Sequence, residues 1–177
     1  HEVEKKRIRD WARLWVNRPG LPKVQSRIVP MGKLTGIETQ TLVGSINEWG
    51  FSSIVLWRSE NGEQATTTLH LNSPAGRYGI DPPDNDGHVL FVFPNYQGYG
   101  YGIFLLDDKS REYVLKNIQN EKDLFMRSMM WGALWDSVRE GELDPREYVR
   151  LVVTVLGSPA YRRPPQGDGG RDRAHPK

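Results

Sequence analysis

The chain has 177 residues, a formal net charge of +2 and no cysteine. Apolar residues make up 37% and charged residues 26%, which supports a core of ordinary size and argues against wholesale disorder. The lack of cysteine excludes disulfides, thiolate nucleophiles and cysteine-bound zinc. The first residues are charged where a signal peptide would be apolar, so we expect a cytoplasmic protein.

The positive charge is concentrated at the end of the chain. Residues 157–177 hold five basic and two acidic residues, so the other 156 residues hold 19 basic and 20 acidic, a net charge of −1. This part lacks the basic stripe that phosphate contacts need, and we expect no nucleic-acid partner. No apolar run approaches the roughly 18 residues of a membrane span, so we expect no membrane partner.

A helix is predicted over residues 3–17. Apolar side chains recur at helical spacing from Ile8 to Trp15, and Pro19 and Gly20 end the pattern.

The next segment, residues 21–107, is predicted to be all-β. Asn61 and Gly62 predict a hairpin with a type I′ turn. Because no crossover helix separates the strands, we predict an antiparallel β-sandwich of about 6–8 strands. The expected strands are Lys23–Val29, Leu34–Leu42, Phe51–Trp57, Gln64–Leu71, His88–Phe93 and Tyr99–Leu106.

Three helices are predicted over residues 108–156. The second ends at Gly141, and the third begins after Asp144, with Pro145 at its first position and Glu147 able to bond back to the cap. Their expected apolar faces are, in chain order, Val114, Leu115 and Ile118; Leu124, Trp131, Leu134, Trp135 and Val138; and Tyr148, Leu151, Val152 and Val155. The remaining residues, 157–177, have the composition of a disordered tail.

Four sequence motifs occur in a fixed order. They are a Trp-rich turn at residues 11–22, a glycine-rich segment from Asn95 to Asp107 that we expect to form the last hairpin of the sandwich, Trp-Gly-Ala-Leu-Trp-Asp at 131–136 and Gly-Glu-Leu-Asp-Pro-Arg-Glu-Tyr at 141–148. This order resembles the region after the catalytic domain in the aminopeptidase N family of gluzincin zinc metallopeptidases. The residues that carry the resemblance are Asn95, Gly98, Gly100, Tyr101, Gly102, Phe104, Asp107, Trp131 and Trp135.

The resemblance implies a division of the chain into four parts. Residues 1–20 would be the terminal helix of a catalytic domain that the chain lacks, and 21–107 the β-sandwich domain. Residues 108–156 would begin a helical C-terminal domain. The partners would be the catalytic domain, which carries zinc and acts on peptides, and the rest of the helical domain.

The catalytic motifs of that family are not found in the chain. The family binds zinc through His-Glu-x-x-His plus a distal Glu. His1 and Glu2 begin such a motif, but Lys5 occupies the second histidine position. The Gly-x-Met-Glu-Asn type loop is absent, and Tyr99 and Tyr101 belong to the glycine-rich segment rather than to a catalytic tyrosine position. We therefore predict a non-catalytic structural fragment, with no catalytic residue, cofactor or metal site of its own.

Other interpretations of the sequence remain open. The four histidines, His1, His70, His88 and His175, are too scattered to predict a metal site. Asp81–Gly87 has the composition of an ordinary turn rather than a calcium loop. The alternative function is a free-standing β-sandwich that binds a peptide or carbohydrate, and the third hypothesis is a peptidase with an unrecognised site.

Overall fold

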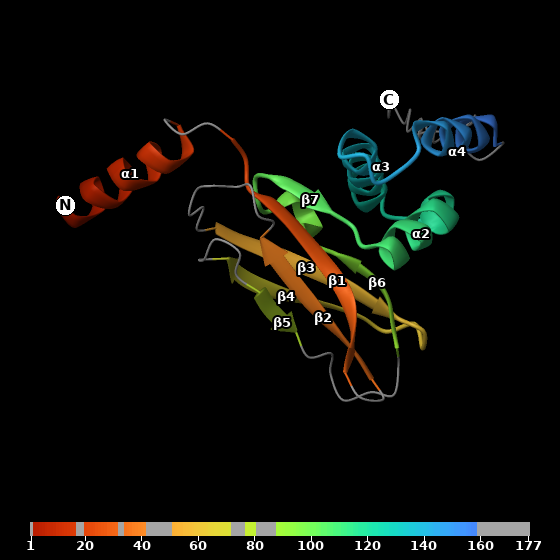
Figure 1. Cartoon of the computed structure of the whole chain (residues 1–177), viewed down its shortest axis with the longest axis horizontal. Coiled ribbons are helices and arrows are strands. Elements are labelled where there is room, and N and C mark those ends of the chain that lie inside the picture. The colour runs from red at the N-terminus through yellow and green to blue at the C-terminus, as the bar shows by residue number, and fades with distance from the viewer. Residues whose placement is uncertain are drawn as a thin grey trace, which may run out of the picture.

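The computed structural model describes residues 2–16, 20–31, 34–41, 51–71, 77–80 and 88–158. Within them it has a mixed α/β architecture, with four α-helices and two small sheets (Figure 1). The interpretations of Asp81–Gly87 and of the tail beyond Ser158 concern residues outside this described part. No helix in the described part is long and apolar enough to cross a membrane.

Seven strands form the two sheets in the described part. One sheet has the order β5-β2-β1-β7 and the other β4-β3-β6. The strands are β1 (Lys23–Met31), β2 (Leu34–Thr41), β3 (Phe51–Ser59), β4 (Gln64–Leu71), β5 (Arg77–Ile80), β6 (Val89–Phe93) and β7 (Ile103–Leu105). The six expected strands are present at least in part, whereas β5 was not predicted because it is only four residues long.

The expectation of a purely antiparallel arrangement is wrong at β7. This strand pairs with β1 in parallel, with Gln25 opposite Leu105. The glycine-rich segment is therefore not the turn of a hairpin, because β6 and β7 lie in different sheets. Its first half is a 3₁₀ turn at Tyr96–Gly98 (η1), where Gln97 and Gly98 have φ of 63° and 64° and carry the chain from one sheet to the other.

The hairpin predicted at Asn61 and Gly62 connects β3 to β4, but its turn is not type I′. Gly62 has a φ of 86°, whereas Asn61 is not among the residues with positive φ. The Gly62 N–H donates to the Ser59 carbonyl at 3.1 Å, and the Ser59 N–H donates to the Glu63 carbonyl at 2.9 Å. This is the longer connection in which a glycine in the left-handed region follows an ordinary turn.

The three-stranded sheet lies between the four-stranded sheet and the helices. One of its faces joins the other sheet around a core cluster that contains Val24, Val55, Trp57 and Phe104. Its other face presents Phe91 and other side chains to the helices. Nearly all of β3 is consequently buried or half-buried, whereas β4 alternates between exposed and more buried positions.

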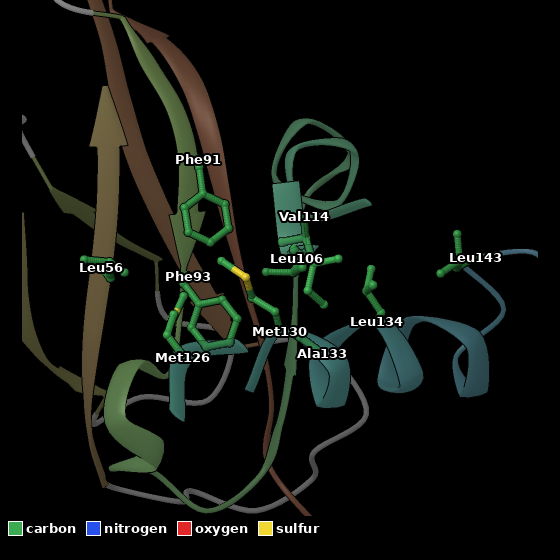
Figure 2. Packing of buried hydrophobic residues seen from close by; sticks show 11 residues of the cluster. Leu56, Phe91, Phe93, Leu106, Val114, Met126, Met130, Ala133, Leu134 and Leu143 are labelled. Carbon is green, nitrogen blue, oxygen red and sulfur yellow. The ribbon is translucent and has the colours of Figure 1, made fainter. Parts of the chain in front are cut away.

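The second core cluster joins the sheet to two helices, α2 (Asp108–Asn117) and α3 (Leu124–Arg139). Figure 2 shows Phe91 and Phe93 on β6 turned toward the helices, with Met126 and Met130 beside Phe93. Burying a side chain of this size stabilises the fold by roughly 1.5–3 kcal/mol. The cluster contains Leu56, Phe91, Phe93, Leu106, Val114, Ile118, Met126, Met130, Ala133, Leu134 and Leu143.

The predicted apolar face of α3 is only partly correct. Its buried residues are Met126, Met130, Ala133, Leu134 and Ser137, whereas the side chains of Leu124 and Trp135 are exposed. Apolar residues occur on nearly every side of this helix, so its periodicity does not select one face.

The ends of the helices follow their capping residues. Asp123 caps α3, Gly141 lies just beyond it with a φ of 78°, and Asp144 caps α4 (Pro145–Gly157) through the Arg146 N–H. The apolar face predicted for α4 is the less exposed one: Val155 is buried, and Tyr148, Leu151 and Val152 are half-buried.

The first helix, α1 (Glu2–Trp15), projects away from the sheets (Figure 1). The side chains of Ile8 and Trp11 are 66% and 57% exposed. Trp15 contacts the Phe51 ring at a centroid distance of 6.2 Å and the Tyr101 ring at 6.1 Å. The apolar face of α1 is thus largely uncovered within the described part of the chain.

Candidate functional site: the joint between the sheets and the helices

Asp107 connects the four-stranded sheet to the start of α2. One carboxylate oxygen accepts from the Ser110 N–H at 2.7 Å, which caps the helix, and the other accepts from the Ile28 N–H of β1 at 2.6 Å. Its backbone carbonyl accepts from the Arg111 N–H at 2.8 Å. Because β7 ends at Leu105, this carboxylate supplies an acceptor to β1 beyond the end of its parallel partner strand.

Ser110 connects the same helix to the other sheet. Its buried hydroxyl accepts from the Val92 N–H of β6 at 3.0 Å. The first turn of α2 is thereby held to both sheets through two adjacent polar groups. Ser110 was not predicted as a functional residue, because its only local signal in the sequence is its place three residues after a capping aspartate.

Asn95 closes the turn that leads from β6 to β7. Its side-chain amide donates to the Gly100 carbonyl at 2.9 Å, and its side-chain oxygen accepts from the Gly100 N–H at 2.7 Å. The Asn95 side chain thus pairs with both backbone groups of Gly100, as a neighbouring strand would. Such a bond helps hold Gln97 in the left-handed region, which non-glycine residues rarely occupy.

Two glycines of the motif allow close packing. A Cβ atom on Gly100 would lie 2.8 Å from the Phe104 ring and 3.2 Å from the Phe51 ring. A Cβ atom on Gly102 would lie 2.6 Å from the backbone oxygen of Pro22, which accepts from the Ile103 N–H at 2.9 Å. The third glycine, Gly98, has a φ of 64°, and a Cβ atom on it would lie 4.0 Å from the Phe125 ring.

The aromatic residues of the motif divide between core and surface. Phe104 is buried and meets Phe51 edge to face at 6.0 Å, whereas the side chain of Tyr101 is 68% exposed. Trp131 and Trp135 contact the Tyr148 ring of α4 at 5.7 and 5.6 Å. They form the seam between α3 and α4 rather than a buried core.

Three ion pairs join residues of the sheets or of α2 to residues that are distant in the sequence, near the ends of helical segments. Lys23 of β1 pairs with Glu140 at the end of α3. Arg58 of β3 pairs with Glu121 at 2.8 Å, and both side chains are largely buried. Burial alone would lower the pKa of Arg58, but hydrogen bonds to Tyr113 and Glu121 raise it above its usual value.

The third pair joins Arg111 of α2 to Glu142 beyond α3 at 2.9 Å. Burial raises the pKa of Glu142, and the charge of Arg111 opposes this shift. Partners so far apart in the sequence leave no local signal, which is why the sequence did not predict these pairs.

The other candidate groups in the described part are its histidines and the residues that line one cavity. Among those residues, no group of three or more His, Asp or Glu side chains is placed to hold a metal ion. The His70 ring is hydrogen bonded to the Ser52 hydroxyl at 2.8 Å. A cavity of about 570 Å³ between β6 and α2 is lined in part by His88, Lys109 and Tyr113.

The comparisons with known proteins give one short similarity. No family model matches the chain. Aminopeptidase N of Streptomyces lividans is 29% identical over 63 residues, which cover 36% of this chain and 7% of that protein. The match is short and distant, and it hints at the aminopeptidase N family. Since it covers so little of the relative, that protein's activity is carried over only as a proposal.

Proposed function

We propose that this chain is a non-catalytic structural segment of a zinc aminopeptidase of the aminopeptidase N type. In this proposal the two sheets are a β-sandwich domain, residues 108–156 begin the helical domain, and residues 1–20 belong to the catalytic domain. The short similarity to Streptomyces lividans aminopeptidase N supports the family. The observation that carries the structural role is the Asp107–Ser110 joint, which connects α2 to both sheets.

The proposed role of the joint is to fix an orientation. A catalytic domain attached through α1 and helices attached beyond α4 would be held at a set angle by the sheets, the joint and the three ion pairs. Such a brace contributes preorganisation to a site formed elsewhere, because misplacing substrate-binding groups by about 1 Å can cost 10²-fold in rate.

The coding sequence upstream of residue 1 tests this proposal directly. We expect an open reading frame that continues into a helix with His-Glu-x-x-His and a more distal Glu. An in-frame start site directly before residue 1 would contradict the proposal. A second check is the hydrolysis of leucine or alanine anilide by the purified chain with added zinc, for which we expect no turnover.

The cavity between β6 and α2 favours a second candidate function, a free-standing binding module. Its volume of about 570 Å³ lies within the usual range for small ligands. Two of its charged lining residues, Glu112 and Lys116, are paired with each other at 2.5 Å. A monodisperse protein with one saturable peptide or carbohydrate ligand, and no upstream zinc motif, would support this function instead.

A further inference from the structure

The outward side of α4 carries an apolar stripe that nothing in the described chain covers. The side chains of Val149, Val153 and Leu156 are 57%, 66% and 53% exposed. Their spacing of i, i+4 and i+7 places them on one side of the helix, away from the buried Val155. Three large aliphatic side chains in a row over two turns form a ridge that can pack into a groove of another helix.

Positive charge lies along one border of this stripe. Arg146 and Arg150 follow each other at i and i+4, and their stems line a groove of about 440 Å³ with Pro145 and Val149. The Arg150 guanidinium makes no ion pair within the described residues, and Arg146 is 3.9 Å from Asp144, with both side chains mostly exposed.

We propose that this outer face of α4 is a docking surface for an acidic amphipathic helix. The aliphatic stripe would bury the apolar face of that helix, and its carboxylates would pair with Arg146 and Arg150. This inference rests on the proposed function, in which the helical domain continues beyond this chain. It specifies that the helix packing on α4 is acidic and amphipathic.

Charge argues against a second copy of the chain as the occupant. Two α4 faces in contact would bring arginines together. The other uncovered helix face, on α1, is also basic, with Lys5, Lys6, Arg7, Arg9 and Arg13 against Glu2, Glu4 and Asp10. Like charges directly opposed disfavour either contact.

The probe is a hydrocarbon-stapled peptide of about four turns, with Leu at i, i+4 and i+7 and Glu beside them, titrated into the full chain. A second peptide has Lys in place of each Glu. We expect amide chemical shifts to change on α4, and the acidic peptide to bind at least about tenfold more tightly than the basic one.

Two variants and two matched controls locate the contact. We expect Val153→Gln to weaken binding of the acidic peptide about tenfold, since Gln keeps the helix but removes the aliphatic contact. We expect Arg150→Glu to reverse the preference between the peptides. Leu124→Gln and Lys122→Glu change equally exposed positions away from α4 and should leave both affinities unchanged.

Equal affinity for the two peptides, or no shift on α4 at millimolar peptide, would overturn the proposal. Self-association that Val153→Gln abolishes would overturn it in favour of a second copy. If the upstream sequence contains the zinc motif but the acidic peptide does not bind, the proposed function stands. Only the proposal that an acidic helix binds α4 is then rejected.

Discussion

The helices at the two ends of this molecule differ in how they use their apolar residues. On the C-terminal side, Val114 of α2 and Met130 of α3 are fully or almost fully buried against the three-stranded sheet. On the N-terminal side, Ile8 and Trp11 of α1 are more than half exposed. Both helical regions have apolar residues at helical spacing, but only one finds its partner within the described chain.

The body of the molecule and α1 therefore differ in what stabilises them. The sheets, α2 and α3 form one body because they share a core and the Asp107–Ser110 joint. In α1, Trp15 contacts the rings of Phe51 and Tyr101 in the body. Short helices are marginal in water without tertiary packing, so the sheets contribute little to the stability of α1 within the described part of the chain.

The largest expected effect comes from truncating the shared core. We expect Met130→Ala to lower the free energy of unfolding by about 2–5 kcal/mol, because it leaves a cavity beside Phe93. Trp11→Ala should change it by less than about 0.5 kcal/mol, since its side chain is mostly solvated. Urea unfolding followed by circular dichroism measures both, and comparable losses would remove the contrast between the two ends.

The next effect comes from the joint. Asp107→Ala should destabilise the protein by about 2–3 kcal/mol, because it removes the cap of α2 and leaves the Ile28 N–H without its acceptor. Asp108→Ala is the matched control: its side chain is 97% exposed and should matter by less than about 1 kcal/mol. Equal midpoints in urea for the two variants would show that the joint does not hold the sheet to the helix.

Gly102→Ala tests the place where the chain after α1 meets the glycine-rich segment. The added methyl would lie 2.6 Å from the Pro22 oxygen, so we expect a loss of about 1–3 kcal/mol. Gly132→Ala adds the same methyl group to α3 with nothing within 4 Å and should stabilise by about 0.5–1 kcal/mol. Thermal melting shows whether each variant is more or less stable than the parent chain. A raised melting temperature for Gly102→Ala would show that the neighbouring Pro22 backbone moves aside easily.

The smallest effect is on the pH dependence. Burial raises the pKa of Asp136 on α3, and Glu140 adds to this while Arg139 opposes it. The folded state then binds this proton more tightly than the unfolded chain, so the contribution of Asp136 to stability falls as the pH rises through its folded pKa.

Asp136→Asn should therefore stabilise the protein by up to about 1 kcal/mol near neutral pH, and the difference should vanish at about pH 3, where the carboxyl is protonated in both states. Glu4→Gln, which removes one carboxyl group from the exposed helix α1, is measured alongside as the charge-matched control. Urea titrations at several pH values measure this, and a difference that persists in acid would contradict the assignment to Asp136.

Local signals in the sequence predicted most of the elements. Asp144 was predicted as a cap and does cap α4, and five of the six predicted strands begin and end within about two residues of their expected bounds, whereas only Ile103–Leu105 of the expected Tyr99–Leu106 is a strand. The boundaries are local because capping and turn formation depend on neighbouring residues. The β6–β7 connection was misjudged because a glycine-rich segment between two strands is equally compatible with a hairpin and with a change of sheet.

The joint could be predicted only in part. Asp107 belonged to the glycine-rich motif, but its bond to the Ile28 N–H depends on the parallel pairing of β1 and β7, which is set by tertiary structure. The pairs of Arg58 with Glu121 and of Arg111 with Glu142 likewise depend on how the helices pack against the sheet. For α3, the nearly uniform apolar character hid which side is buried.

Native-state hydrogen exchange on the whole chain, measured by mass spectrometry at rising denaturant, tests the central claim most directly. We expect amides of the two sheets, α2 and α3 to lose protection together in one cooperative step, and amides of α1 to exchange close to the unfolded rate throughout. Protection of α1 equal to that of the sheets, or release of α2 and α3 well before the sheets, would contradict this contrast between the shared core and the exposed helix α1.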